Sequence, residues 1–419
     1  MTGQPDALAD GSSTLSAQGL RDQGLRNGGP RDQGPSNRGA PGNRGPLLGW
    51  FISYALLTVP QAAGPVAFSL LALSLTGKTS GGAAMILAMT LAQVVGAIPL
   101  TRLGRNLPSA TVLKLLMIFR ALALTAIVLC AASGVPFLWL IVLAAAAGSV
   151  NGAAYGYLRS LLNHFTSAAA LPRALGIAST LNEVTFVLAP VAASGLGTVS
   201  PIFAILALAI LGAVPALLVP NVGTAHIDDR HQAGGSVLSP AILLWLICAG
   251  AGGATVAAIE IGAVALAVNF GYAPALAILF TVPLCLASVA GGIWISVRNR
   301  VATRKAVLAQ LCIMTFGSAL VALDQSITLT VIGALLIGFV LAPLGTYYSL
   351  VLDKLAPPQR RPEVFALLRT ANALGIIFTS AVLTVAPLPM ALIVITGLMG
   401  TVTCTVALAS RGSRTHHSG

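Results

Sequence analysis

The chain has 419 residues, of which 56% are hydrophobic and only 8% are charged, and its mean hydropathy is +0.89. Soluble domains carry about 25% charged residues, so this composition excludes a water-soluble globular protein. The net charge of +12 is spread between apolar runs and forms no dense patch, which argues against a nucleic-acid partner.

The first 46 residues are rich in Gly, Asn, Gln, Arg and Pro and have no apolar periodicity. Such a segment buries too little apolar surface to fold, so we expect residues 1–46 to be a disordered cytoplasmic tail. It also lacks the apolar core of a signal peptide. Its basic residues either rest on anionic lipid headgroups or stay solvated and help to fix the topology. They are Arg21, Arg26, Arg31, Arg38 and Arg44.

The remainder of the chain is divided by charges and Pro/Gly breaks into twelve apolar segments. A helix needs roughly 20 apolar residues to cross the ~30 Å hydrocarbon core of a bilayer, so each segment is a candidate membrane span and the predicted fold is all-α. The predicted spans are 47–75, 80–100, 108–132, 135–160, 171–196, 200–220, 239–267, 273–297, 305–323, 326–352, 363–386 and 389–410.

Lys and Arg gather in alternate connections, whereas the opposite connections contain only Lys78. Because cytoplasmic loops carry the excess of basic residues, we expect a multi-pass protein of the inner or plasma membrane with both termini in the cytoplasm. The residues that set this orientation are Arg102, Arg105, Arg159, Arg173, Arg298, Arg300, Arg304, Lys305, Lys354, Arg360, Arg361, Arg411 and Arg414.

The chain contains an internal repeat. An offset of 190 residues superposes Tyr157 on Tyr347, Thr180 on Thr370 and Asn182 on Asn372. Two related halves imply a pseudo-two-fold axis along the membrane normal and a binding site at their interface. The predicted organisation is a six-helix bundle, a cytoplasmic linker, a second six-helix bundle and a cytoplasmic tail, over 47–220, 221–238, 239–410 and 411–419.

With twelve spans, a repeat and a basic connection after the second span, the chain resembles the major facilitator superfamily over residues 47–410. The family signature in that connection is Gly-x-x-x-Asp-Arg-x-Gly-Arg-Lys/Arg, and here the stretch reads AIPLTRLGRN. Arg102, Gly104 and Arg105 match, whereas Thr101 replaces the Asp and an Ala replaces the first Gly. The resemblance implies two pseudo-symmetric six-helix bundles, alternating access, and a conformational switch at this loop.

Two further signatures concern export. Proton-exchanging exporters carry Gly-x-x-x-Gly-Pro-x-x-Gly-Gly in the fifth helix, and TFVLAPVAAS keeps Pro190 and small residues there. Antiporters also place an Arg in the fourth helix, at a position that Ala144 occupies here. The chain is therefore similar to bacterial drug/proton antiporters with degenerate motifs.

The fifth predicted span contains four polar residues. At 100° per residue, Ser179, Thr180, Asn182 and Glu183 fall within an arc of about 160°, which predicts a polar stripe that faces protein or water. Desolvation favours the neutral form of a carboxyl group, so Glu183 is a candidate proton carrier. The alternative is a packing carboxyl bonded to a neighbouring Ser or Asn.

Two other spans hold ionisable residues, which at bilayer depth are functional candidates. Glu260 is either a second proton-coupling residue or a hydrated group at a cavity mouth. Arg369 aligns with Ser179 under the 190-residue offset, so Arg369, Thr370 and Asn372 form the matching stripe. Arg369 either pairs with an acid across the cavity, binds a charge on the substrate, or is hydrated near the cytoplasmic end.

The other charges near the spans have simpler interpretations. Lys114 is expected to extend to the headgroups, and for Arg120 this interpretation and a functional one stay open. Arg159 and Arg173 are expected at the interface, and Asp324 and Asp353 in water. Further cavity candidates are Tyr54, Gln61, Gln93, Asn151, Tyr155, Tyr347 and Tyr348.

We therefore predict a secondary transporter for proton-coupled efflux of a small amphipathic or drug-like molecule, acting as a monomer in a lipid bilayer. An uptake permease of the same fold is the alternative. A membrane-embedded enzyme is less favoured, because the sequence has no cluster of catalytic spacing, and it has no Gly-x-x-x-x-Gly-Lys-Ser/Thr loop for a nucleotide. All five Cys lie in apolar spans, so we expect no metal site and no cofactor.

Overall fold

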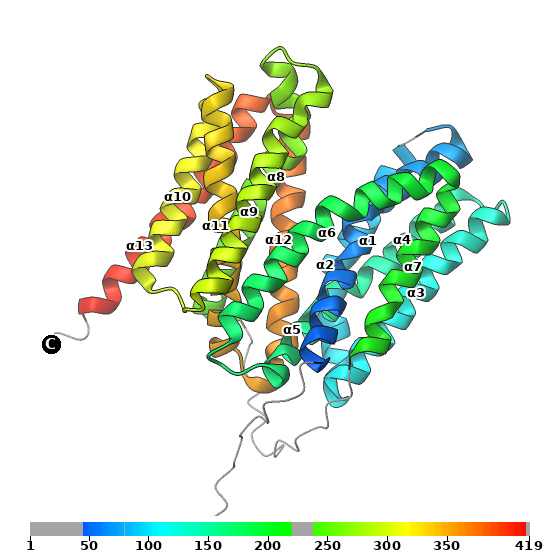
Figure 1. The fold of residues 1–419 in the computed structure, drawn as a ribbon, viewed down its shortest axis with the longest axis horizontal. Coiled ribbons are helices and arrows are strands. Elements are labelled where there is room, and N and C mark those ends of the chain that lie inside the picture. Colours follow the sequence, from blue (N-terminus) through cyan, green and yellow to red (C-terminus); the bar gives the residue numbers. More distant parts are fainter. Residues whose placement is uncertain (1–44, 79, 220–237, 416–419) are drawn as a thin grey trace, which may run out of the picture. The chain divides into compact units, whose positions relative to one another are not determined.

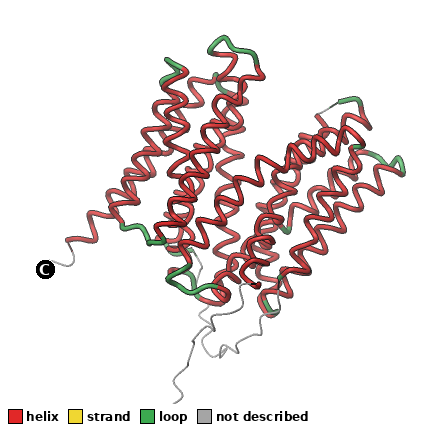
Figure 2. The backbone as a smooth tube through the Cα atoms, viewed as in Figure 1, coloured by secondary structure: helices red, strands yellow, loops and turns green. Residues whose placement is uncertain are grey.

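The computed structural model describes residues 45–78, 80–219 and 238–415, and every regular element in this part is a helix (Figures 1 and 2). Within these described residues, twelve helical spans are long and apolar enough to cross a membrane, which confirms the predicted fold class. The predicted N-terminal tail and the linker 221–238 lie almost wholly outside the described residues.

The first set of helices, here called the N-half, packs largely on itself: α1 contacts α6 and α7, α2 contacts α4, and α3 contacts α7. Buried side chains of these helices form the two hydrophobic clusters of this half. Its elements are α1 (Gly45–Thr76), α2 (Ser80–Leu103), η1 (Gly104–Asn106), α3 (Ser109–Ala132), α4 (Phe137–Ser149), α5 (Asn151–Phe165), α6 (Leu171–Val199) and α7 (Pro201–Leu218).

The second set, here called the C-half, packs in the same way: α8 contacts α12, α9 contacts α11, and α10 contacts α11 and α13. A large buried cluster fills its centre. Its elements are α8 (Pro240–Asn269), η2 (Pro274–Ala277), α9 (Ile278–Arg298), α10 (Arg304–Ala322), α11 (Ile327–Leu355), η3 (Pro358–Arg360), α12 (Arg361–Val385) and α13 (Leu388–Thr415).

The main departure from the predicted spans is in the fourth, which consists of two helices, α4 and α5, that meet at Val150. Gly148, Ser149 and Gly152 surround the junction, and Gly and Ser are weak helix formers. Gly148 lies directly against the backbone of Met89 on α2, so the junction is also a point of close helix contact. The junction places Asn151 at the start of α5.

Hydroxyl side chains cap the N-termini of three helices. Ser239, Thr303 and Ser326 each accept a hydrogen bond from a backbone N–H of the first turn of α8, α10 and α11. This pairing satisfies one of the N–H groups that a helix start leaves open. The local sequence thus fixes these helix starts.

The two halves meet through α5 and α2 against α12, and through α6 against α9 and α11. Small residues permit the close approach: Gly156 of α5 lies against the carbonyl of Pro362, and Gly176 of α6 lies against Gly292 of α9. Such contacts are typical of helix packing in membranes. In Figure 1 the two halves come together at one end and diverge toward the other.

Candidate functional site

A cavity of about 180 Å³ lies between the halves. Residues of α1, α5, α6, α8, α10, α11 and α12 line it. Several predicted residues contribute to it: Tyr54, Tyr155, Ser179, Asn182, Tyr348, Arg369 and Asn372.

Arg369 connects the cavity wall to a chain of amide side chains in the N-half. Its Nη2 donates a hydrogen bond to Oε1 of Gln61 on α1, and its Cζ lies 5.6 Å from the ring centroid of Tyr155. Asn151 donates from Nδ2 to the same oxygen of Gln61, at 3.0 Å, and to Oε1 of Gln93, at 2.7 Å. Three predicted cavity residues therefore form one network behind Arg369.

Arg120 lies in the same network, and it does not extend to the headgroups. Only 2% of its surface is exposed. It donates to the carbonyls of Leu57, at 2.9 Å, and Gly212, at 3.2 Å, and to Oδ1 of Asn151, at 3.5 Å. The guanidinium of Arg120 stays inside the bundle because backbone carbonyls of two neighbouring helices, α1 and α7, accept its hydrogen bonds there.

One part of the polar stripe of α6 faces the cavity, and the other part packs against α9. Ser179 and Asn182 line the cavity, whereas Thr180 packs against Gly292 of α9. Glu183 is half-buried and lies beside Ser288 of α9, outside the residues that line the cavity. The contacts that the structure gives Arg369 are Gln61 and Tyr155, and Glu183 is not among them.

Glu260 of α8 is exposed and lies close enough to Glu183 for their charges to act on each other. Cys285 of α9 is near both carboxylates. The two proton-coupling candidates are therefore neighbours across α6, α8 and α9. Within the described residues, no group of three His, Cys, Asp or Glu side chains has the arrangement of a metal site.

Three other predicted residues lie away from the cavity. Tyr347 is buried and packs its ring 5.1 Å from that of Trp245. Thr370 is buried on α12, with its hydroxyl unpaired, and Gln93 is buried behind Asn151. Of the two adjacent tyrosines on α11, the structure places Tyr348 in the cavity wall and turns Tyr347 into the C-half core.

The basic end of the protein carries the connections 104–108, 166–170, 299–303 and 356–360, and there the halves are joined by polar contacts. Arg102 pairs with Glu363 at 2.9 Å. Asn299 accepts from the backbone N of Arg173 and donates to the carbonyl of Ala169, both at 3.0 Å. Thr101, which replaces the signature Asp, contributes its carbonyl to the hydroxyl of Tyr157.

The other two loop residues predicted at the switch lie beside this ion pair. Gly104 leaves space for the hydroxyl of Tyr157 and the side chain of Val112, which a Cβ would approach to 2.6 and 2.7 Å. Arg105 is exposed. Arg102 is therefore the residue of this loop whose charge pairs with a carboxylate of the C-half, that of Glu363.

Two contacts at this end join residues that are 190 positions apart. Nε of Arg159 donates to Oγ of Ser349 at 2.6 Å, and Nδ2 of Asn163 donates to Oδ1 of Asp353 at 2.7 Å. A residue that contacts its own repeat mate lies beside the two-fold axis. The contacts therefore place the predicted pseudo-two-fold axis between α5 and α11.

These contacts correct two expectations. Arg159 was expected at the membrane interface, but it is 1% exposed and its Cζ lies 4.5 Å from the ring centroid of Phe365. Asp353 was expected in water, but it binds Asn163 and also pairs with Arg361 at 3.4 Å. Sequence reasoning missed Ser349 and Glu363 altogether, although the 190-residue offset assigns Ser349 to Arg159.

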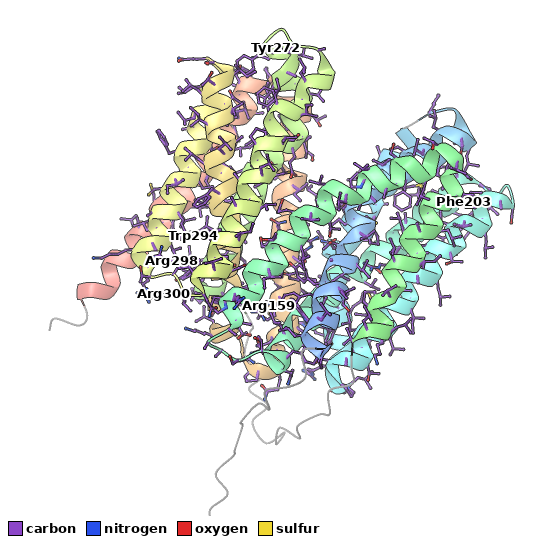
Figure 3. The ribbon with its side chains drawn as sticks, viewed as in Figure 1. Arg159, Phe203, Tyr272, Trp294, Arg298 and Arg300 are labelled. Carbon is purple, nitrogen blue, oxygen red and sulfur yellow. The ribbon has the colours of Figure 1, made fainter. Side chains whose placement is uncertain are left out.

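The helices of the two halves converge toward the basic end. Figure 3 shows Arg159 where the helices converge, whereas Tyr272 and Phe203 mark the far ends of the two diverging halves. The cavity is thus closed toward the basic end.

Comparison with solved structures shows the same fold. A bacterial homologue of the iron transporter ferroportin in an outward-facing state is 14% identical, with a TM-score of 0.73 over 87% of this chain and 99% of that one. The human organic anion transporter MFSD10 is 14% identical, with a TM-score of 0.66 over 86% of this chain and 97% of that one. The E. coli fucose:proton symporter is 14% identical, with a TM-score of 0.65 over 87% of this chain and 98% of that one. No curated protein sequence matches the chain.

A family model, described as Major Facilitator Superfamily, matches residues 47–380. This range extends from the start of α1 into α12 and so includes every helix that lines the cavity. With its twelve candidate spans and its two-fold contacts, the chain belongs to the Major Facilitator Superfamily.

Proposed function

We propose that the protein is a secondary active transporter that exports a small amphipathic molecule in exchange for protons, by alternating access. One observation carries this proposal: a cavity lined by both halves is closed at one end by inter-half polar contacts. A structure of this kind exposes its site to one side of a membrane at a time. With the basic end in the cytoplasm, the conformation described here is open to the outside.

The proton step is assigned to Glu183, with Glu260 as its neighbour. Glu183 is half-buried at the contact between α6 and α9, where the two halves move against each other in alternating access. A carboxyl group that changes its surroundings between two states changes its proton affinity as well. Protonation can thereby be tied to the conformational change.

Import of a solute is the second candidate, because the fucose:proton symporter shares this fold. The substrates named for the structural neighbours are iron, organic anions and fucose, which are chemically unlike one another. Direction and substrate therefore have to be measured on this chain. We expect it to act as a monomer in the inner or plasma membrane.

The deciding experiment is transport in reconstituted vesicles with an imposed pH gradient. We expect substrate flux to follow the gradient in the wild type and to become independent of it in Glu183→Gln. Asp324→Asn is the matched control, since this carboxylate lies between α10 and α11 and accepts from Asn269. Flux that ignores the gradient in the wild type, or normal coupling in Glu183→Gln, would contradict the proton assignment. Accumulation on the inside of whole cells would favour import.

A further inference from the structure

The cavity has an unbalanced positive charge. Arg369 is the one charged side chain among the described residues that line it. The carboxylates of the described spans lie elsewhere. Glu183 lies beside Ser288 of α9, and Glu260 is exposed on α8. Glu363 pairs with Arg102 and Asp353 binds Asn163, both at the basic end. A cation in a water-filled cavity without an acid is a ready partner for an anion.

The present partners of Arg369 are neutral and leave most of its donors available. A guanidinium has five N–H donors in a planar fork that matches a carboxylate with two parallel hydrogen bonds. The structure gives Arg369 one hydrogen bond, to Oε1 of Gln61, and the face of Tyr155. The same oxygen of Gln61 accepts from Asn151, so Gln61 keeps a partner when Arg369 turns away from it.

The remaining wall suits an apolar or aromatic body. Tyr54 and Tyr155 lie with their ring centroids 6.1 Å apart, and Tyr348 faces the cavity from α11. Leucines of α6, α11 and α12 and a methionine of α10 complete the apolar wall, while Asn182 and Asn372 add two amides. Aromatic and apolar walls with a few polar groups are typical of sites for organic molecules.

We propose that the cavity binds an amphipathic organic monoanion, with its anionic group on Arg369 in place of Gln61 and its apolar part among the tyrosines. The inference rests on the proposed function, because it names the substrate class of the same cavity. In this proposal Arg369 binds the anionic group of the ligand, and the tyrosines contact its apolar part.

The test is a binding titration with three probes that share a dansyl group and differ in charge: dansylglycine, dansylglycinamide and dansylcadaverine. We expect purified wild-type protein to bind the anionic dansylglycine at least tenfold more tightly than the neutral amide, because charge-assisted bidentate bonds are strong. Arg369→Gln should lose that tenfold preference, and Arg369→Lys should keep part of it. Arg300→Gln, an exposed residue at the basic end, is the matched control.

Melting curves of each variant check that it is folded. Equal binding of dansylglycine and its amide, a preference for dansylcadaverine, no binding of dansylglycine, or an unchanged preference in Arg369→Gln would each overturn the inference. These readouts need no pH gradient. If dansylglycine binds through Arg369 while flux in vesicles ignores the gradient, proton coupling fails and the anion site stands.

Discussion

Arg120 shows how one buried side chain joins two helices that contain proline. Its acceptors, the carbonyls of Leu57 and Gly212, each lie three residues before a proline, Pro60 in α1 and Pro215 in α7. Proline removes a backbone donor and disturbs the preceding turn. The guanidinium donates to carbonyls next to these disturbed turns, so a cation in the core has backbone acceptors from two helices although no carboxylate lies beside it.

We expect Arg120→Met to lower the melting temperature of the purified protein. Two buried carbonyls each lose a hydrogen bond from a charged group, which contributes about 1.5–3 kcal/mol, while loss of the buried charge offsets part of this. Scanning fluorimetry measures the shift, with Arg105→Met, an exposed arginine, as control. Equal melting of Arg120→Met and the control would show that the carbonyls are satisfied without Arg120.

At the scale of elements, the contact between α5 and α12 depends on the absence of a side chain at Gly156. Any Cβ there would overlap the carbonyl of Pro362 and reach within 3.1 Å of the backbone N of Ala366. Gly345 of α11 also lines the cavity, yet a Cβ there would meet nothing within 4 Å. The two glycines therefore differ in what they contribute, although both lie between the halves.

We expect Gly156→Val to keep the fold and lose transport, because closure at the basic end brings backbone against backbone at this point. Gly397→Ala on α13, outside the cavity lining and with nothing within 4 Å of the added Cβ, should transport at about the wild-type rate. Flux in vesicles, with melting curves for both variants, makes the comparison. Normal flux in Gly156→Val would mean that α5 and α12 need not come this close during the cycle.

The helices follow from the sequence because each must satisfy its own backbone in lipid, so apolar length alone sets most of their bounds. The faces of α6 could not be predicted as well. The arc of about 160° from Ser179 to Glu183 is wide enough to face two neighbours, and only the packing of α9 decides that Glu183 lies beside Ser288. Arg159 and Asp353 were misplaced for a similar reason, since their partners lie 190 residues away.

For the whole molecule, the ion pair between Arg102 and Glu363 contributes to the equilibrium between the conformation in which the basic end is closed and the one in which it is open. The side chain of Arg102 is 65% exposed and that of Glu363 is 10% exposed, and exposed ion pairs contribute about 0.2–1 kcal/mol. We expect Glu363→Gln to shift the equilibrium by up to about fivefold toward separation at the basic end. Spin labels at positions 105 and 300, in a background without native cysteines, measure the separation.

The double variant Arg102→Glu with Glu363→Arg exchanges the two charges, and it should return part of the equilibrium to the state in which the basic end is closed. Asp324→Asn is the control, because it removes a carboxylate from a contact within the C-half. An unchanged distance distribution in Glu363→Gln would show that the backbone contacts of the halves alone hold the basic end closed.

The two-fold contacts permit a direct test of alternating access. Asn163 of α5 and Asp353 of α11 are bonded across the halves at 2.7 Å, and opening of the basic end must part them. In a cysteine-free background, cysteines at 163 and 353 joined by a short reducible cross-linker should stop transport almost completely, and reduction should restore it. The matched control joins cysteines at 163 and 167, which lie four residues apart in the N-half, with Ser167 exposed, and move together. Transport that continues with the 163–353 cross-link intact would show that the halves do not separate at this end, and the cavity would then need another route to the cytoplasm.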